Sequence, residues 1–310
     1  MTTGRRHLIS ILDLSDDELR DLVTRGARYA RREIEPARPL RDRVVGIYFR
    51  KTSTRTRTAF SAGALRLGAH IITYGPNDLQ ENTGESVVDT GRVLSRMLDG
   101  LVARTAGSEE EMRTLAGQSR MAVINAMSAD EHPTQAIADL TTLLCHFGAL
   151  EGLRVLYVGE GNNTAVCLAL GLARFRGATL ELRTPPGYGL PAGKLAAAHE
   201  LSRRSAAAVR ERHDVLDLPG DVDVVYTTRW QTTGATKSDP NWRDTFAPFR
   251  VTVGLMERYP RALFMHDLPA HRGEDVDAEV IDGAQSVAFD QAENKLHSAM
   301  AVLEWCLAGR

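Results

Sequence analysis

Short apolar runs alternate along the chain with longer segments in which apolar residues recur every three or four positions. Four runs in the first half are rich in strand-forming residues and predict β-strands, at 44–49, 69–74, 100–104 and 121–126. The segments between them predict amphipathic helices. The first helix opens at Ser15, with Glu18 three positions later, and this spacing is typical of a capping box. Further helices are expected from Phe60 onward, over 85–98, and from Pro133 through Leu144.

The alternation starts again after Gly152. The second half predicts strands at 153–159, 178–182, 222–226 and 263–266, and helices at 165–173, 194–208 and 294–307. Strands that alternate with helices indicate parallel sheets covered by helices. We therefore expect an α/β protein of two parallel-sheet domains, 1–147 and 148–310, with a C-terminal helix at about 294–308 that packs back on the first domain.

Size and charge narrow the class of protein. A chain of 310 residues is longer than a domain with a single hydrophobic core usually is, which favours two domains. Its formal net charge of -2 provides no overall field that would attract nucleic acid or a membrane surface. The N-terminus shows no apolar signal stretch, and the three cysteines are far apart and not in metal-ligand spacing. We expect a cytoplasmic protein with reduced thiols, no metal and no organic cofactor.

Candidate chemistry is densest at residues 53–57, where a predicted strand gives way to a helix. Ser53, Thr54, Arg55 and Thr56 place three hydroxyls and a guanidinium at a helix start, and Arg57 adds a second guanidinium. Helix N-termini offer free N–H groups to anions, and arginine matches phosphate with two parallel hydrogen bonds. The pattern favours a phosphate site. The alternative is a capped helix with solvated arginines.

Three further segments place polar side chains after predicted strands, where ligands of α/β sheets gather. Arg104 ends one strand and is either a ligand-binding group or a surface ion-pair partner. His132 and Gln135 bracket a helix start and could both donate to a carbonyl oxygen, or His132 could simply cap the helix. Asp267 is either a turn former or a carboxylate directed at a ligand.

Together these motifs resemble the aspartate/ornithine carbamoyltransferase family. The resemblance rests on Phe-x-Lys-x-Ser-Thr-Arg-Thr-Arg at 49–57 and His-Pro-Thr-Gln at 132–135. Segments 84–90, 159–163, 268–272 and 289–294 favour the ornithine branch. It implies a carbamoyl phosphate domain followed by a Rossmann-like acceptor domain, transfer of a carbamoyl group to a small amine or amino acid, and a homotrimer with shared active sites.

The resemblance also assigns roles to individual residues. Arg55, Arg104, His132, Gln135 and Asp267 are the expected catalytic residues. Carbamoyl phosphate would be held by Ser53, Thr54, Arg55, Thr56, Arg104, His132, Gln135, Leu268, Lys295 and a Gln80 supplied by a neighbouring subunit. The acceptor would be held by Asn163, Thr228, Thr232, Thr233 and Asp267.

The chain departs from the ornithine branch mainly on the acceptor side. Asp267 stands where the family usually has cysteine, and Thr228 where it has aspartate. Thr232 and Thr233 replace Ser-Met, and Lys295 replaces an arginine. Our hypothesis is an altered acceptor, such as a shorter or modified diamino acid of specialised metabolism. The alternative is a standard ornithine carbamoyltransferase that makes citrulline.

Two other classes of protein are compatible with parts of the sequence. A catalytically silent relative that binds carbamoyl phosphate and acts as a regulator is compatible with Lys295, but retention of His132 and Gln135 argues against it. A nucleotide-dependent oxidoreductase is suggested by Gly159 and Gly161. Its dinucleotide fingerprint requires a third glycine where this chain has Thr164, so we reject it.

Overall fold

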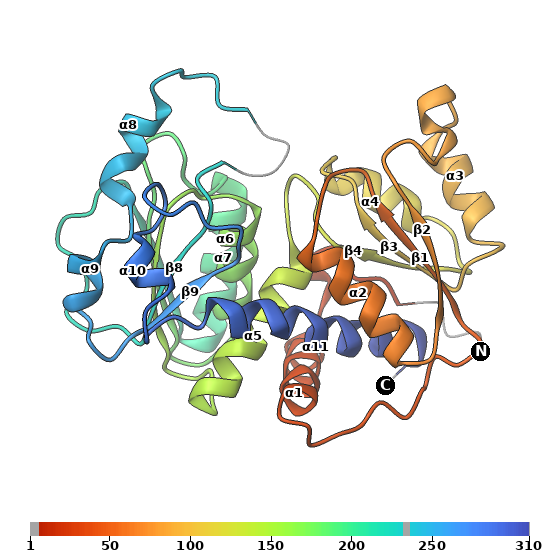
Figure 1. Cartoon of the computed structure of the whole chain (residues 1–310), viewed down its shortest axis with the longest axis horizontal. Helices are drawn as coiled ribbons and strands as arrows, with labels where there is room; N and C mark the ends of the chain where they lie inside the picture. The colour runs from red at the N-terminus through yellow and green to blue at the C-terminus, as the bar shows by residue number, and fades with distance from the viewer. Residues whose placement is uncertain (1–5, 232–235, 310) are drawn as a thin grey trace. The chain divides into compact units, whose positions relative to one another are not determined.

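The structure is a computed structural model that describes residues 6–231 and 236–309. The chain forms two compact units, drawn in Figure 1. Unit 1 comprises Met1–Thr141 together with Glu293–Arg310, and unit 2 comprises Thr142–Ala292. Both are parallel-sheet α/β domains, as the sequence pattern predicts.

The sheet of unit 1 has the strand order β2-β1-β3-β4, and all its pairings are parallel. Its strands coincide closely with the four predicted runs: β1 (Val44–Phe49), β2 (His70–Tyr74), β3 (Gly100–Arg104) and β4 (Ala122–Asn125). The chain order reverses between β1 and β3, the position at which open α/β sheets bind ligands. The carboxyl ends of β1 and β3 therefore define where the site of unit 1 should be sought.

Five α-helices accompany this sheet along the chain: α1 (Asp16–Ala30), α2 (Arg55–Arg66), α3 (Val87–Leu94), α4 (Glu109–Ala116) and α5 (Pro133–Phe147). The predicted capping box is present, since Ser15 accepts from the Glu18 N–H and Glu18 from the Ser15 N–H. Two 3₁₀ turns, Ile11–Asp13 and Gln80–Thr83, precede α1 and α3. Helix α4 was not predicted, and α3 is shorter than the predicted 85–98.

The sheet of unit 2 has the strand order β7-β6-β5-β8-β9, again fully parallel. Its strands are β5 (Arg154–Val158), β6 (Thr179–Arg183), β7 (Ala208–Arg212), β8 (Val224–Thr227) and β9 (Leu263–His266). The order reverses between β5 and β8, so the carboxyl ends of these strands mark the equivalent ligand position.

One helix of unit 2 ends earlier than the sequence predicts. They are α6 (Asn163–Leu172), α7 (Ala192–Ser205), α8 (Trp242–Phe246), α9 (Val253–Glu257) and α10 (Ala278–Ile281), with a 3₁₀ turn at Ala247–Phe249. The predicted helix 194–208 is wrong at its end, because Ala206 is left-handed and Ala208 begins the unpredicted strand β7. In β7 only Val209 is buried, so this edge strand carries little apolar pattern.

The last helix, α11 (Ala288–Leu307), begins six residues before the predicted 294. From Glu293 onward it belongs to unit 1, which confirms the expected return to the first half. Gly63 of α2 lies against Met300, and the buried Glu304 accepts hydrogen bonds from Arg25 and Tyr29 of α1. The division between units falls inside α5 and near the start of α11. The functional limits 1–147 and 148–310 remain predictions.

Within the described ranges, no helix combines the length and apolar character needed to cross a bilayer. The same ranges hold no group of three or more His, Cys, Asp or Glu side chains arranged to hold a metal ion. Cys145, Cys167 and Cys306 are thiols outside any disulfide, and the last two are buried. Burial raises the pKa of the Cys306 thiol, which keeps it protonated.

Candidate active site

The carboxyl edge of the unit 1 sheet brings Arg104 beside the predicted phosphate segment. In the parallel register of β1 and β3, Arg104 lies opposite Phe49, and the Arg50 N–H donates to the Arg104 carbonyl at 3.0 Å. The chain then runs from Arg50 into residues 53–56 at the same edge. Arg104 is only 8% exposed, so it is not the surface ion-pair partner that was the alternative to a ligand-binding group.

Helix α2 begins at Arg55, within the segment expected to bind phosphate. Thr54 occupies the cap position, but its side chain makes no capping hydrogen bond. A simple capped helix start is therefore not observed. Thr56 is buried, whereas Arg55 and Ser53 are half-buried and Thr54 is exposed. This geometry leaves the first turn of α2 suited to an anion.

A small cavity in unit 1 joins the predicted donor-site residues. It is lined by Thr56 and Phe60 of α2, His132 just before α5, Thr134 and Gln135 of α5, and Lys295 of α11. The return of α11 therefore completes the cavity wall. Four of the six lining residues were predicted from the sequence; Phe60 and Thr134 were not assigned to the site.

His132 is held in its neutral form. Burial lowers its pKa well below the usual 6.5, and the nearby charges of Arg104 and Lys295 lower it further. The ring Nδ1 lies 3.3 Å from the Thr134 hydroxyl. His132 therefore carries a neutral N–H donor rather than a full positive charge.

Gln135 sits between a carboxylate and an ammonium group. Its Nε2 donates to Asp139 Oδ1 at 2.7 Å, and its Oε1 accepts from the Lys295 ammonium. All three side chains belong to buried residues of unit 1. The sequence suggested that the carboxamide could donate to a ligand carbonyl. The structure instead directs a donor of Gln135 to Asp139.

Gln80 lies apart from this cavity lining. It is the first residue of the 3₁₀ turn before α3, and its side-chain oxygen accepts from the Thr83 hydroxyl at 2.8 Å. Arg50 holds this turn through ion pairs with Glu81 at 2.7 Å and with Glu111 of α4. The role of Gln80 in a neighbouring subunit remains a proposal.

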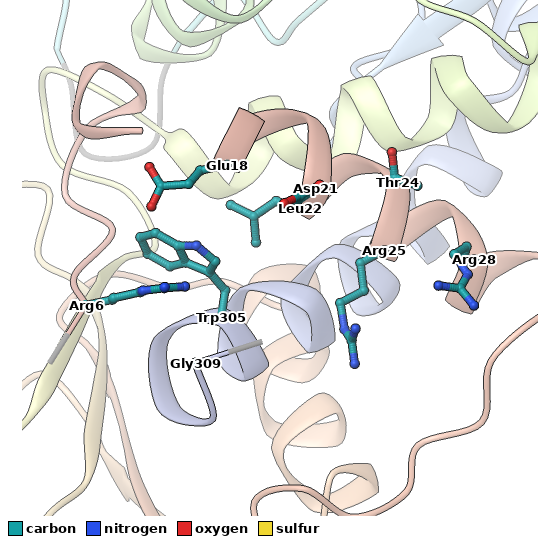
Figure 2. A pocket seen from close by; sticks show the side chains of 9 residues that line it. All are labelled: Arg6, Glu18, Asp21, Leu22, Thr24, Arg25, Arg28, Trp305 and Gly309. Carbon is teal, nitrogen blue, oxygen red and sulfur yellow. The ribbon is translucent and has the colours of Figure 1, made fainter. Parts of the chain in front are cut away.

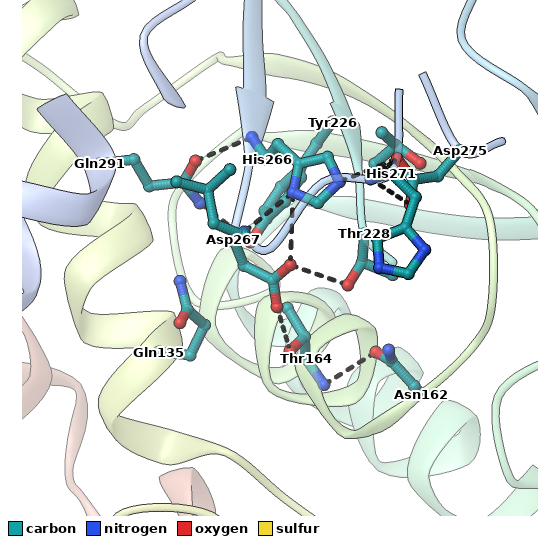
Figure 3. A network of polar contacts seen from close by, with 12 residues as sticks. Gln135, Asn162, Thr164, Tyr226, Thr228, His266, Asp267, His271, Asp275 and Gln291 are labelled. Carbon is teal, nitrogen blue, oxygen red and sulfur yellow. Dashed lines mark hydrogen bonds and ion pairs between the residues drawn. The ribbon is translucent and has the colours of Figure 1, made fainter. Parts of the chain in front are cut away.

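In unit 2, two of the acceptor candidates, Thr228 and Asp267, meet Thr164 at the carboxyl ends of three adjacent strands (Figure 3). Asp267 follows β9, Thr228 follows β8, and Thr164 lies in the first turn of α6 after β5. The hydroxyls of Thr228 and Thr164 donate to Asp267 Oδ1 and Oδ2 at 2.8 and 3.0 Å. Asp267 is therefore a held carboxylate, 14% exposed, rather than a solvated turn former.

The loop after Asp267 is fixed by a buried histidine. The Leu268 N–H donates to His266 Nδ1 at 2.8 Å, so the ring proton is on Nε2, which lies 3.5 Å from the buried Asp275. Figure 3 shows Asp275 on the side of His266 opposite Asp267. Leu268 adopts a positive φ of 56° before the cis Pro269. Its predicted contact with carbamoyl phosphate remains a proposal.

Asn163 begins α6 after a glycine turn. Asn162 caps the helix by accepting from the N–H groups of Thr164 and Ala165, and the side chain of Asn163 is buried. Gly161 is required because a Cβ there would come within 2.4 Å of the Gly189 backbone. The turn thus brings Asn163 to the same sheet edge as Thr228.

Lys237 lies in a cage formed by one carboxylate and aromatic rings of unit 2. The Lys237 ammonium pairs with Glu160 and lies 4.5 Å from the ring centroids of both Tyr188 and Phe246. Its side chain is 5% exposed. Predicted acceptor residues Thr232 and Thr233 precede it and lie outside the described residues.

A larger hollow of about 400 Å³ occurs elsewhere in unit 1 (Figure 2). Its lining includes Arg25 and Arg28 of α1, Trp305 of α11, and Arg6, whose guanidinium lies 5.3 Å from the Trp305 ring centroid. None of the predicted site residues lines it, so it plays no part in the donor site.

Three residues that organise the two clusters were missed from the sequence. Asp139 stands four positions after Gln135, and this helical spacing was a usable signal for contact. In the sequence, Thr164 is distinguished only as the residue that breaks a dinucleotide fingerprint. Lys237 carried no local signal, because its partners Glu160 and Tyr188 are distant in sequence.

The fold agrees with the comparisons to known proteins. The family described as "Aspartate/ornithine carbamoyltransferase, carbamoyl-P binding domain" matches residues 6–144, and its "Asp/Orn binding domain" matches residues 151–306. The chain belongs to the aspartate/ornithine carbamoyltransferase family and is a carbamoyltransferase.

Similar proteins carry a more specific name. The chain is 41% identical to the ornithine carbamoyltransferase of Symbiobacterium thermophilum, covering 99% of this chain and 100% of that one. It is 38% identical to that of Methanothermobacter thermautotrophicus, with 97% and 99% coverage. The solved ornithine carbamoyltransferase of Pyrococcus furiosus matches with a TM-score of 0.92 at 34% identity, covering 100% of this chain and 99% of that chain.

Proposed function

We propose that this carbamoyltransferase transfers the carbamoyl group of carbamoyl phosphate to the side-chain amine of ornithine, giving citrulline and inorganic phosphate. The observation that carries the donor half is the cavity of unit 1, where Thr56, His132, Gln135 and Lys295 converge. The acceptor half is supported by relatives that are named ornithine carbamoyltransferases and match over the whole chain.

The donor cluster matches the charges of carbamoyl phosphate. The first turn of α2, with Ser53, Thr54, Arg55 and Thr56, would bind the phosphate. Arg104 and Lys295 would stabilise the negative charge that grows on phosphate as it leaves. The neutral N–H of His132 would donate to the carbamoyl oxygen as it becomes negative during attack. Leu268 would complete the donor-binding set.

The acceptor must react as a neutral amine, although a free alkylamine has a pKa of about 10. In our proposal Asp267 binds the ammonium group and takes its proton, while Asn163 binds the α-groups. The amine nitrogen then bonds to the carbamoyl carbon as the bond from that carbon to the phosphate oxygen breaks. The bonding electrons leave with phosphate, and a further proton passes from nitrogen to solvent.

One observation favours a second candidate, a diamino acid of another length. The carboxylate of this cluster is carried by Asp267 and held by Thr228, at positions where the ornithine branch resembled by this chain has cysteine and aspartate. A carboxylate on a different strand end changes where the reacting amine is held. An acceptor shorter than ornithine, from specialised metabolism, would suit such a shift.

Steady-state measurement of ureido product and phosphate tests both candidates. The panel contains ornithine, 2,4-diaminobutyrate, lysine, putrescine and aspartate, each with carbamoyl phosphate. We expect saturable turnover with the highest kcat/KM for ornithine. A higher kcat/KM for 2,4-diaminobutyrate would establish the second candidate instead. No product or phosphate release with any amine would refute the transferase proposal in favour of a silent relative.

We further propose a homotrimer in which Gln80 reaches the donor site of a neighbouring subunit. The edge strand β2 leaves Ile72 44% exposed, and Val93 and Met97 are also exposed apolar residues of unit 1. Light scattering should give the mass of three chains. Mixing inactive Gln80→Ala and Arg55→Ala subunits should restore activity, because some sites then receive both intact residues. Absence of recovery after verified subunit exchange would contradict shared sites.

A further inference from the structure

A buried polar chain in unit 1 runs from α11 to the middle of α5. The Lys295 ammonium donates to Gln135 Oε1, and Gln135 Nε2 donates to Asp139 Oδ1 at 2.7 Å. Asp139 is 0% exposed, Gln135 1% and Lys295 8%. Because Gln135 and Asp139 are one helical turn apart, α5 itself holds the carboxylate against the amide.

This chain fixes the orientation of the Gln135 carboxamide. An ionised carboxylate only accepts hydrogen bonds and an ammonium only donates them. The NH₂ group must therefore face Asp139, and the oxygen must face Lys295. Turning the amide over would place like partners against each other at both ends, at the cost of two buried hydrogen bonds.

The cavity lies on the oxygen side of this amide. Lys295 and Gln135 both line the cavity, whereas Asp139 is not among the lining residues. The side of Gln135 available to a ligand thus presents a hydrogen-bond acceptor. His132 lines the same cavity, and its neutral ring carries one N–H group.

An acceptor at this place can distinguish two similar acyl phosphates. Carbamoyl phosphate carries an NH₂ group on its carbonyl carbon, and acetyl phosphate carries a methyl group of nearly the same size. Only the NH₂ group can donate to Gln135 Oε1. The amide oxygen can accept two hydrogen bonds, and Lys295 supplies only one of them. An analogue that lacks the NH₂ donor leaves the second acceptor site of this buried oxygen unfilled and is therefore disfavoured.

We propose that Asp139 is a positioning residue that holds Gln135 with its oxygen toward the bound donor, and through Gln135 makes the pocket select a carbamoyl over an acetyl group. This inference rests on the proposed use of carbamoyl phosphate in the unit 1 cavity. Asp139 does not itself line the cavity, so its effect is exerted through the orientation of the amide.

A matched pair of stable phosphonates tests the proposal on the full-length protein. Phosphonoacetamide carries the NH₂ group and acetonylphosphonate carries a methyl group in its place. Isothermal titration calorimetry on the wild type should show about tenfold or greater preference for the amide, as expected for one well-placed buried hydrogen bond to the second acceptor site of the Gln135 oxygen. Asp139→Asn should lower this preference severalfold, and Gln135→Met should abolish it.

The double variant separates positioning from general damage. If Asp139 acts through Gln135, adding Asp139→Asn to Gln135→Met leaves the ratio of the two dissociation constants unchanged. Glu304→Gln is the control, because it also removes a buried carboxylate from unit 1 but should keep the wild-type preference while lowering the melting temperature. Asp139→Ser supplies the same comparison if Asp139→Asn does not fold.

Two results would overturn the inference. One is an unchanged amide preference in folded Asp139→Asn. The other is that Asp139→Asn lowers the amide preference by the same factor in the Gln135→Met variant as in the wild type. Failure of the proposed function looks different, since the wild type would then neither bind phosphonoacetamide nor release phosphate from carbamoyl phosphate in the presence of any amine.

Discussion

The hydroxyl of Thr228 donates a hydrogen bond to Asp267 Oδ1 at 2.8 Å, joining the ends of two neighbouring strands. In the β8–β9 register Thr227 pairs with His266, and this pairing places the next residues, Thr228 and Asp267, side by side. Thr164 holds the second carboxylate oxygen from α6. The carboxylate is therefore oriented before any ligand binds.

Replacement of Asp267 by asparagine should mainly damage the acceptor half of the reaction. We expect kcat/KM for the amine to fall about 10²-fold or more, since both charge attraction and the proton acceptor are lost. Affinity for phosphonoacetamide should stay within about twofold of wild type, since the donor cluster is unchanged. Initial-rate kinetics and calorimetry measure the two effects. Asp282→Asn, which removes only an exposed ion pair with Arg272, serves as the control.

Substitution of Arg104 by lysine should weaken use of carbamoyl phosphate. Lysine keeps the charge but loses the planar fork that makes two hydrogen bonds to one phosphate or carbonyl region. We expect kcat/KM for carbamoyl phosphate to fall about 10- to 100-fold. The same change at the exposed Arg120 of unit 1 should have no kinetic effect. Equal kinetics for Arg104→Lys and wild type would remove Arg104 from the donor site.

The neutral His132 should make the folded chain sensitive to acid. Its pKa in the folded state is well below 6.5, whereas the unfolded chain takes up a proton at about 6.5. Below that pH the unfolded state binds more protons, so the free energy of unfolding falls as pH decreases and is unaffected by this group above it.

This linkage is measurable by denaturant unfolding at pH 7.5 and pH 5.0. Between pH 7.5 and pH 5.0, the free energy of unfolding of His132→Asn should fall by about 2 kcal/mol less than that of the wild type. The reason is that the variant lacks the imidazole that takes up a proton on unfolding. His70→Asn, at an exposed position of β2, should behave as the wild type. Identical acid sensitivity of His132→Asn and wild type would show that His132 is not held neutral.

The cage around Lys237 should contribute to the stability of unit 2. Lys237→Met keeps a chain of similar length among the rings but leaves Glu160 without this partner. We expect unfolding to become easier by about 2 to 3 kcal/mol. Arg243→Met removes an exposed cation from the face of Trp242 and should cost less than about 1 kcal/mol. Thermal unfolding of both variants tests the difference.

The repeating strands and helices were predictable because their periodicities are local. Val44–Phe49 and Gly100–Arg104 are apolar runs of strand length, and both were placed correctly. Helix α4 was missed although Ser108 and Glu111 form a recognisable helix start, and the Ser108 side chain accepts from the Glu111 N–H. Strand β7 lacked a signal, because an edge strand with one buried residue has almost no apolar pattern.

The donor site was more predictable than the acceptor site. Residues 53–56 and 132–135 form compact motifs whose chemistry is visible in a few adjacent letters. Thr164, Thr228 and Asp267 are more than thirty residues from one another, and nothing local joins them. Their association depends on which strands are neighbours in the sheet.

The sequence by itself determined the two-domain α/β class, the helix start at the phosphate segment and the family, because period, capping and ordered motifs depend on residues close together in the chain. The tertiary structure alone decided that Thr228 and Asp267 share a hydrogen bond and that Lys295 meets Gln135 from 160 positions away. Those contacts arise from strand register and from the return of α11 to unit 1. Both are set by burial of apolar faces over the whole domain, which no short stretch of sequence specifies.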